Sequence, residues 1–555
     1  MRLSQNAKAS DLEYKMQEKP NKLFNILYPI FIFAVAFFIR IYNIDLLPIN
    51  HDEAHWARAL LYNPEFFNKI AGIPVISFPF IPYSLKLFLI GSISSSGVPS
   101  LNEFMLYVRL QPVVIGAATV LLVYILAKQM YGRRTAIISS LLLCFLPWHI
   151  IHSRIMGRVI WVPFFGCLIF LILYKAIKEK KRIWAGLWFL LSCFLLKESL
   201  RHYQAALLFV PIFFVILILV KKDTDWRKNT GVLLAYALTF VIFLLPFTCS
   251  LIAKGNKFWE GFFRVYQKNI FEGNLLLNIF SNFSNNAGLA FKVLFFNFSG
   301  SSLLYGKALE APLLVYPLVS LFFVAALIIS FCRRKTSDKI LLAWLFLGFF
   351  GAMAGVCFFQ PRYILIILPP SIILIARLIA EIFNRAAFLK RPAQRRCLSA
   401  VGITLCLGLV AGEITQWARY YYSAPFHFEE CRSNSYGCKE ASEYLSRISD
   451  IKDYDIMADT RMTVDVYLKY YLLSAGKINR YYDLYSHKSE KDKFYVLWAP
   501  ESHSRDYWDG MLRHNYDFFK QKHPDAILIK TIYYPNGLAA IHILKVENTA
   551  NYLTE

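Results

Sequence analysis

The chain has 555 residues, of which 57% are hydrophobic, 17% are aromatic and only 18% are charged, and its mean hydropathy is positive. This composition argues against a soluble globular protein and indicates a polytopic membrane protein. The formal net charge of +24 does not point to nucleic acid as a partner, because the basic residues are concentrated in alternate connections between apolar segments.

Apolar stretches close to the length that a membrane span requires, roughly 20 residues, recur along most of the chain. Eleven spans are predicted, and the two short ones that begin near 136 and 183 are candidates for tilted or partly re-entrant segments. The predicted spans are residues 23–42, 106–126, 136–151, 159–174, 183–196, 204–220, 231–251, 312–331, 340–358, 363–383 and 398–416.

Basic residues occur in every second connection between these spans, which the positive-inside rule places in the cytoplasm together with the tail 1–22. The loops 43–105 and 252–311 and the region 417–555 are then predicted on the outer side. The first span follows a long polar tail and lacks a small-residue cleavage site, so it is predicted to be an anchor rather than a signal peptide. The basic clusters are Lys128, Arg133 and Arg134; Lys175, Lys178, Lys180, Lys181 and Arg182; Lys221, Lys222, Arg227 and Lys228; Arg333, Arg334, Lys335 and Lys339; Arg385, Lys390, Arg391, Arg395 and Arg396.

Three domains are predicted: the cytoplasmic tail, a transmembrane domain at 23–416 and a soluble α/β domain at 417–555 on the outer face. Within the transmembrane domain, the outer loop 252–311 mixes aromatic and basic residues, which suits a segment that lies on the bilayer or covers a cavity. The pattern of the last domain predicts helices and strands in alternation. The helices are predicted at 440–448, 464–473 and 508–520, and the strands at 454–458, 494–499, 526–533 and 538–545.

Cys431 and Cys438 flank six residues of the outer domain. This spacing can close a small disulfide loop in an oxidising compartment, and the alternative is a pair of free thiols.

An acidic pair, Asp52 and Glu53, follows the first span within a dense polar cluster at residues 48–58. Asn50 can cap a helix through the amide of Glu53, three residues on, and the helix dipole favours negative charge in the first turn. A capping role is therefore one hypothesis for the pair. The other hypothesis is chemistry, because further polar side chains crowd the same one or two turns. These neighbours are His51, His55 and Arg58.

His51 and His55 share a helix face at i, i+4, a spacing that also permits a divalent metal site with Asp52. Two histidines and one carboxylate with no further ligand in the sequence nearby are weak support for a metal, so no cofactor is predicted firmly.

The order of several motifs resembles the polyprenyl-phosphate-sugar-dependent glycosyltransferases of the GT-C fold, and within them the bacterial relatives of protein O-mannosyltransferases and the lipid A aminoarabinose transferase. The likeness covers most of residues 25–380. Its motifs are Pro48 with Asp52 and Glu53, the run 78–83, Arg109 within 108–112, Tyr131 to Arg134, the run 147–154 ending in Ser153 and Arg154, Lys197 before a span, and Arg362 and Tyr363 before a span with Pro369 and Pro370.

This resemblance implies that Asp52 is the catalytic base, with Glu53 beside it. A carboxylate within hydrogen-bond reach can accept the proton of an acceptor hydroxyl as it attacks the anomeric carbon. Fixed cations near the membrane surface would stabilise the polyprenyl phosphate as it leaves, and for each of them the alternative is a snorkelling residue that pairs with lipid headgroups. The candidate donor-binding residues are Arg58, Arg109, Arg154, Lys197, Arg201, Arg362 and Tyr363.

The chain departs from the family pattern at two positions. Relatives often carry a second acidic residue shortly after the Ser-Arg pair, whereas residues 155–160 here contain none, and Glu198 or Glu53 would have to replace it. The lysine that relatives place near the first-loop proline motif is also not evident, because Phe78 precedes Pro79. The resemblance therefore supports Asp52 more strongly than the donor-phosphate contacts.

The leading hypothesis is a glycosyltransferase of the bacterial cytoplasmic membrane that moves a sugar from a polyprenyl-phosphate donor to a lipid, glycan or protein acceptor on the outer face. One alternative is an oligosaccharyltransferase-like or ligase-like enzyme that moves a preassembled glycan. Others are a transporter or lipid flippase, and a non-catalytic scaffold. Transporters place ionisable groups at mid-membrane and show paired repeats, whereas the centres of the predicted spans here lack acidic residues and no repeat is found.

Overall fold

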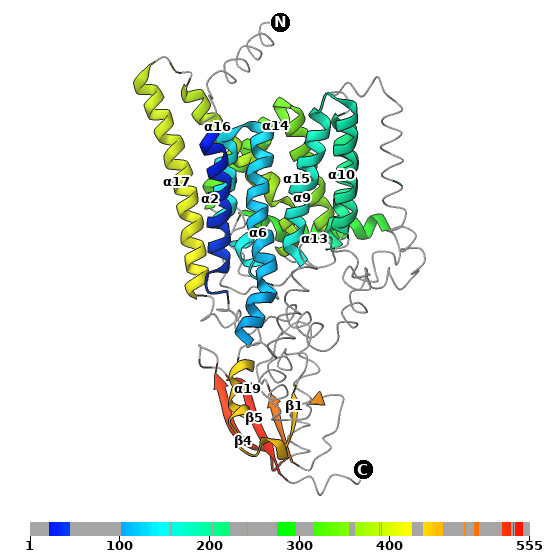
Figure 1. Cartoon of the computed structure of the whole chain (residues 1–555), viewed down its shortest axis with the longest axis vertical. Helices are drawn as coiled ribbons and strands as arrows, with labels where there is room; N and C mark the ends of the chain where they lie inside the picture. The colour runs from blue at the N-terminus through cyan, green and yellow to red at the C-terminus, as the bar shows by residue number, and fades with distance from the viewer. Residues whose placement is uncertain are drawn as a thin grey trace.

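A computed structural model of the chain forms a bundle of apolar helices and a separate β-sheet (Figure 1). The structure describes residues 22–44, 101–155, 158–200, 202, 204–220, 241, 275–295, 316–354, 361–387, 389, 391–423, 437–458, 482–483, 493–498, 524–533, 537 and 539–547.

The helices of the bundle follow the predicted spans closely. In chain order they are α2 (Lys22–Ile41), α6 (Leu101–Tyr131), α7 (Arg133–Phe145), α8 (Pro147–His152), η2 (Arg158–Ile160), α9 (Trp161–Lys178), α10 (Arg182–Leu200), η3 (Gln204–Leu208), α11 (Phe209–Val220), α13 (Leu275–Phe295), α14 (Tyr316–Arg333), α15 (Thr336–Ala354), η8 (Pro361–Ile367), α16 (Leu368–Ala387) and α17 (Pro392–Ser423). Ten of the eleven predicted spans coincide with these helices, and the span at 231–251 lies outside the described residues except for Val241.

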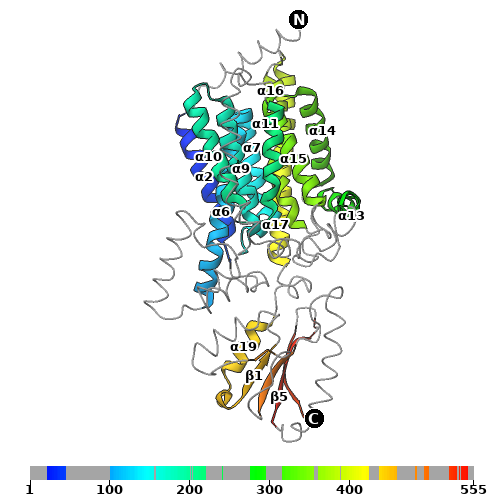
Figure 2. The ribbon, with the colours of Figure 1, turned by 90° about the vertical axis from the view of Figure 1, so that its right-hand side faces the viewer.

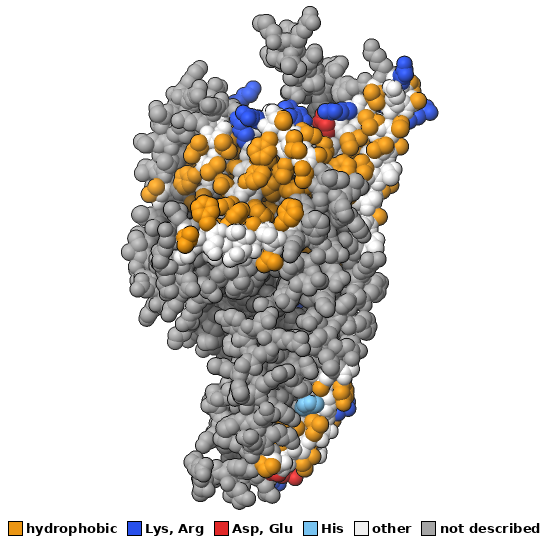
Figure 3. Space-filling model, turned by 180° about the vertical axis from the view of Figure 1, so that it is seen from behind, with side chains coloured by type: hydrophobic (Ala, Val, Ile, Leu, Met, Phe, Trp, Pro, Cys, Tyr) orange, Lys and Arg blue, Asp and Glu red, His pale blue; other side chains and the backbone are white. Residues whose placement is uncertain are grey.

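Seven helices in the described part of the chain are long and apolar enough to cross a membrane, and two shorter apolar helices cover 205–220 and 322–333. Side chains such as Ile30, Phe38, Ile218 and Ile403 are more than half exposed on the outside of the bundle. Figure 3 shows hydrophobic side chains in a continuous band below a row of Lys and Arg side chains. This surface is that of an integral membrane protein.

The basic connections lie together at one end of the bundle. The turns α6–α7, α9–α10, α14–α15 and α16–α17 all lie at the end where α2 begins (Figures 1 and 2). The end of α2, the start of α6 and the end of α17 lie at the opposite end, from which the chain continues to the β-sheet. The alternation of charge predicted from the sequence is thus matched by the arrangement of the helices.

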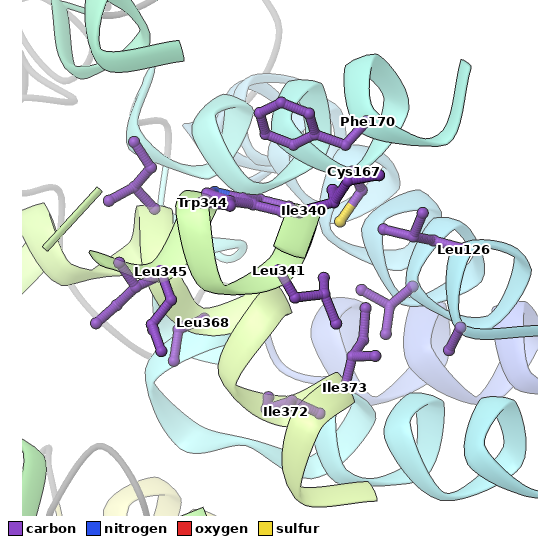
Figure 4. Packing of buried hydrophobic residues seen from close by; sticks show 14 of the residues in the cluster. Leu126, Cys167, Phe170, Ile340, Leu341, Trp344, Leu345, Leu368, Ile372 and Ile373 are labelled. Carbon is purple, nitrogen blue, oxygen red and sulfur yellow. The ribbon is translucent and has the colours of Figure 1, made fainter. Parts of the chain in front are cut away.

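The core of the bundle is built on α9, α15 and α16 (Figure 4). Trp344 of α15 is fully buried and its ring lies 4.6 Å from that of Phe170 on α9. Gly166 faces the same indole, because a Cβ atom there would lie 2.6 Å from Trp344 Cζ2. Small residues allow this close approach, which matters in lipid, where helices associate through packing rather than through the hydrophobic effect.

The predicted span at 136–151 is broken into two helices. α7 ends at Phe145, Leu146 is extended with ψ of 114°, and Pro147 begins α8. Proline lacks an amide hydrogen and favours the first turn of a helix. The break ends α7 after 13 residues. It places α8 at the end of the bundle opposite the basic connections, next to the site described below.

α13 is a helix within the predicted outer loop 252–311. Its axis lies across those of the other helices in both views (Figures 1 and 2). Leu277, Phe280 and Phe291 are more than half exposed, whereas Asn286 and Ala290 are buried, and the Asn286 amide donates to the carbonyl of Met353. α13 therefore has an apolar exposed face and a buried face, and its place on the bilayer or over a cavity stays a prediction.

The described residues between 437 and 547 contain a five-stranded mixed sheet in the order β2-β1-β3-β5-β4. β1 pairs in parallel with β2 and β3, and β5 pairs antiparallel with β3 and β4. The strands predicted at 454–458, 494–499, 526–533 and 538–545 are present within one or two residues, whereas the helices predicted at 464–473 and 508–520 lie outside the described residues. The elements are α19 (Cys438–Ser446), η10 (Ile451–Asp453), β1 (Asp455–Ala458), β2 (Tyr482–Asp483), β3 (Phe494–Trp498), β4 (Ile527–Tyr533) and β5 (Ala539–Val546).

A polar cluster joins the end of β5 to the segment before β1. The Tyr454 hydroxyl donates to Glu547 Oε1 at 2.8 Å, and Lys545 Nζ lies 2.5 Å from the same oxygen. The Lys545 ammonium, followed by the Tyr454 hydroxyl, lowers the pKa of the Glu547 carboxyl by bonding its charged form. Burial raises the pKa of Tyr495, whose ring packs on Tyr454, to about 12.

Candidate functional site

The candidate site lies at the end of the bundle opposite the basic connections, where several short elements meet. η2 contacts α6, α8 and η8, and η8 contacts α9, α15 and α16. The residues around Arg154 and those around Tyr363 are 209 positions apart in the chain. In the structure, both lie at the end of the bundle where α2 stops. These two predicted motifs therefore share one end of the fold.

Two of the predicted cations hold the turn that directly follows α2 in place. Arg109 of α6 donates through Nη1 to the Ile44 carbonyl, and Arg154 donates through Nη2 to the Asn43 carbonyl, each at 2.5 Å. Asn43 has a φ of 42°, so the chain turns there through the left-handed region, which asparagine tolerates. Asp52 lies nine residues after Asn43 in the chain. The two arginines fix the point from which that acidic loop departs.

A third arginine, Arg40, lies fully buried one turn before this point. Its Nη1 donates to the carbonyls of Ala36 and Cys144, and its Nη2 lies 2.7 Å from Nδ1 of His149 on α8. Its Nε and the Nε2 of His149 have no hydrogen-bond partner among the described residues. A buried guanidinium of this kind needs an anion nearby, and no described carboxylate forms an ion pair with Arg40.

Gly116 of α6 allows these groups to pack closely. A Cβ atom at Gly116 would lie 2.3 Å from Ser153 Cβ and 3.1 Å from Arg40 Nε. Ser153 is itself buried, and its hydroxyl donates to the Ile150 carbonyl at 2.7 Å. Only a residue without a side chain lets α6 approach the end of α8 this closely.

Gly116→Ala is expected to push the segment at Ser153 and Arg154 away from α6. Overpacking of this kind costs roughly 1–3 kcal/mol, so the unfolding temperature in detergent should fall clearly. Gly186→Ala on α10 is the matched control, because a Cβ atom there meets nothing within 4 Å. Equal unfolding temperatures for the two variants in scanning fluorimetry would show that the close contact at Gly116 is unimportant.

The end of α10 brings a second polar group to this end of the bundle. Lys197 Nζ lies 3.8 Å from Glu198 Oε1, and the Glu198 side chain is 7% exposed. Beyond it, the ring of His202 stacks on Trp161 at 4.4 Å and lies 4.9 Å from Phe165. Glu198, the proposed replacement for the absent second acid, is thus paired with a lysine that the sequence also singled out.

The remaining predicted site residues stand as follows. Tyr363 is buried in η8. Arg362 belongs to the same 3₁₀ helix, and only the backbone of Arg362 is described. Cys438 is buried at the start of α19, and its predicted disulfide partner Cys431 is outside the described residues, so that pairing stays a prediction. Also outside the described residues are His51, Asp52, Glu53, His55, Arg58 and Arg201.

The predicted metal site at His51, Asp52 and His55 also stays a prediction. In the described ranges, no group of three or more histidine, cysteine, aspartate or glutamate side chains is placed to hold a metal ion, and the candidate ligands His51 and His55 lie outside those ranges. His149 and His152 bond and stack rather than form such a group: His149 meets Arg40, and His152 packs on Trp148 at 6.1 Å.

Arg40 and its partner His149 were not among the predicted donor-binding residues. Arg40 lies within the first predicted span, where a snorkelling side chain is the ordinary expectation. A charged residue inside a span is also a signal of function, and this signal would have identified Arg40. Its position twelve residues before Asp52 could be read from the sequence, but its contact with α8 could not.

Comparison with known proteins identifies the fold. Residues 101–248 match the family model of dolichyl-phosphate-mannose-protein mannosyltransferases. The structure of ArnT from Cupriavidus metallidurans bound to undecaprenyl phosphate aligns with a TM-score of 0.52 and 12% identity, over 93% of this chain and 98% of that one. No curated protein sequence matches the chain significantly.

A second similar structure is an oligosaccharyltransferase from Archaeoglobus fulgidus, tethered to an acceptor peptide containing the NVT sequon. It aligns with a TM-score of 0.52 and 14% identity, over 94% of this chain and 74% of that one. Another structure shows the Archaeoglobus fulgidus oligosaccharyltransferase AglB in complex with an inhibitory peptide and a dolichol-phosphate. The present chain spans 64% of the length of that protein. The chain therefore has the GT-C membrane fold, as its sequence motifs predicted.

Proposed function

We propose that this GT-C membrane protein is a glycosyltransferase that moves a sugar from a polyprenyl-phosphate donor to an acceptor on the outer face of the membrane. The acceptor is a lipid, a glycan or a protein, and Asp52 is the general base. The family match over 101–248 and the fold shared with ArnT support glycosyl transfer in general. We place the protein in a bacterial cytoplasmic membrane, with the acidic loop and the sheet outside.

The observation that carries the proposal is the group of three buried arginines around the end of α2. Arg40, Arg109 and Arg154 are all at least nine-tenths buried. Each donates to a backbone carbonyl oxygen, and Arg40 also bonds to His149. Concentrated buried positive charge is costly unless an anion balances it. A lipid phosphate and the carboxylates of the following loop would supply that balance together.

This arrangement fits the chemistry of the proposed reaction. The polyprenyl phosphate leaves with negative charge, and cations fixed in a water-poor site stabilise such charge more than they would in water. The acceptor hydroxyl must lose its proton at the same time, which a carboxylate can accept. The arginines and Asp52 would thus act on opposite sides of the anomeric carbon, which predicts inversion there.

The direct test uses purified protein, a polyprenyl-phosphate sugar labelled in the sugar, and membranes as the source of acceptor. Label in a lipid, glycan or protein product supports the proposal, and the class of product identifies the acceptor. Uptake of a solute into vesicles with no labelled product would instead indicate a transporter. Transfer of a preassembled glycan but not of a single sugar would favour the oligosaccharyltransferase-like alternative.

Arg154→Gln is expected to raise the KM for the donor by roughly 10- to 100-fold, the value of a charge-assisted bond to phosphate. Arg154→Lys should recover part of the loss because it keeps the charge but not the fork of donors. Arg134→Gln is the control, since Arg134 is exposed at the opposite end and bonds to Asn384. A donor KM unchanged in Arg154→Gln would exclude this residue from the donor site.

A further inference from the structure

A cleft lies between α14 and α16 at the basic end of the bundle, far from the candidate site. Its volume is about 420 Å³, within the range of small-molecule sites. The walls are largely aliphatic and include Ile329 of α14 and Leu374 and Leu378 of α16. Val324, Ile328 and Phe331 of α14 are about half exposed beside it, so the cleft opens on the apolar outer surface of the bundle.

Three arginines and one glutamate complete the lining: Arg333, Arg377, Glu381 and Arg385. Arg333 Nη1 lies 3.3 Å from Glu381 Oε2, and Arg385 Nε lies 3.6 Å from Glu381 Oε1, so a single carboxylate is shared between two rim cations. The rim therefore keeps an excess of positive charge. Arginine favours phosphate because its planar fork of donors matches the phosphate oxygens.

The third arginine supplies an independent sign of a ligand. The Arg377 side chain is 7% exposed, and its Nη1 pairs with Asp338 on α15 and bonds to the Ser330 hydroxyl at 2.9 Å. Its Nη2 has no hydrogen-bond partner among the described residues, although Arg377 lines the cleft. A buried guanidinium nitrogen without an acceptor costs free energy, and an acceptor in the cleft that draws the Arg377 side chain toward it would remove that cost.

We propose that this cleft binds one anionic glycerophospholipid from the leaflet at the basic end, with its phosphate at Arg333, Arg377 and Arg385 and an acyl chain along the aliphatic walls. The combination of a cationic rim and an apolar channel open to the bilayer matches both parts of such a lipid. Figure 3 shows Lys and Arg side chains directly above the hydrophobic band, the level at which headgroups meet a membrane protein. The site is separate from the donor site, because it lies at the other end of the bundle.

The test compares two double variants of the full chain by native mass spectrometry, with phosphatidylglycerol and phosphatidylcholine of identical acyl chains as probes. Arg333→Gln with Arg385→Gln removes both rim cations. Arg395→Gln with Arg396→Gln removes the same charge from exposed positions at the same end of the bundle that do not line the cleft. Because a basic residue near a charged membrane surface contributes about 1 kcal/mol, we expect the first variant to bind phosphatidylglycerol roughly 30-fold more weakly than wild type.

The control variant should bind phosphatidylglycerol as the wild type does, and both should prefer it to phosphatidylcholine by about tenfold or more. Leu378→Trp, which fills the cleft and keeps every arginine, should also weaken binding. Inorganic phosphate should not displace the lipid, since the acyl chain contributes to binding. Any one of four results would overturn the proposal. These are an equal loss of phosphatidylglycerol binding in the two double variants, equal binding of the two lipids by the wild type, undiminished binding by Leu378→Trp, and displacement of the lipid by inorganic phosphate.

Discussion

Asp52→Asn is expected to lower the rate of sugar transfer by roughly 100- to 10,000-fold, the usual contribution of a general base. The amide keeps the size of the carboxylate and can still occupy a helix start, but it cannot accept a proton at neutral pH. Arg109 and Arg154 remain to hold Ile44 and Asn43, so the loop should leave the bundle from the same point. The donor KM should therefore change little while kcat falls.

Glu53→Gln is the matched control for this prediction. If a helix begins at this point, Asn50 is its cap and Glu53 is its third residue. Glutamine at the third position still closes the cap. Its transfer rate should stay within a few-fold of wild type. Initial rates measured with a labelled polyprenyl-phosphate sugar distinguish the two roles, and an Asp52→Asn variant that works as fast as wild type would remove Asp52 as the base.

Asp338→Ala is expected to destabilise the bundle by roughly 3–5 kcal/mol, the cost of leaving one member of a buried ion pair without its partner. Asp338 is fully buried in the first turn of α15, and its Oδ1 accepts bonds from Arg377 and from the Tyr131 hydroxyl, the latter at 2.7 Å. Its Oδ2 accepts from the backbone amide of Lys335 at 3.3 Å. One carboxylate thus joins α6, α15 and α16.

A double-mutant cycle separates the ion pair from the other contacts. Asp338→Leu combined with Arg377→Met removes both charges and should be far less destabilising than Asp338→Ala alone, because no buried charge is left without its partner. The measurement is the midpoint of unfolding in mixed detergent micelles for the four proteins of the cycle. Additive losses in the double variant would mean that the pair contributes nothing specific to the bundle.

The sequence predicted the bundle well because its signals are local. A span reveals itself by length and apolarity, and basic connections reveal its direction. The break at Pro147 was the main local departure, since the run 136–151 is apolar on both sides of the proline and was predicted as one span. In the C-terminal part of the chain, alternating apolar residues predicted β1, β3, β4 and β5 to within one or two residues.

Contacts between distant parts of the chain could not be predicted in this way. Arg40 meets His149 across 109 positions, and Tyr131 meets Asp338 across 207. Neither pair has a spacing that a helix or strand period would reveal. The motif order groups Arg109 and Arg154 in one predicted site, which stays a prediction. Their bonds to the Ile44 and Asn43 carbonyls depend on how α6 and α8 pack near the end of α2.

The strand order of the sheet has a consequence for biosynthesis. β5 lies between β3 and β4, although it follows both in the chain. Until residues 539–546 have left the ribosome, β4 has no neighbour in this sheet and β3 has only β1. β2, β1 and β3 can therefore pair as they are made, whereas the edge of β3 and the whole of β4 stay unpaired in this sheet until β5 is inserted between them.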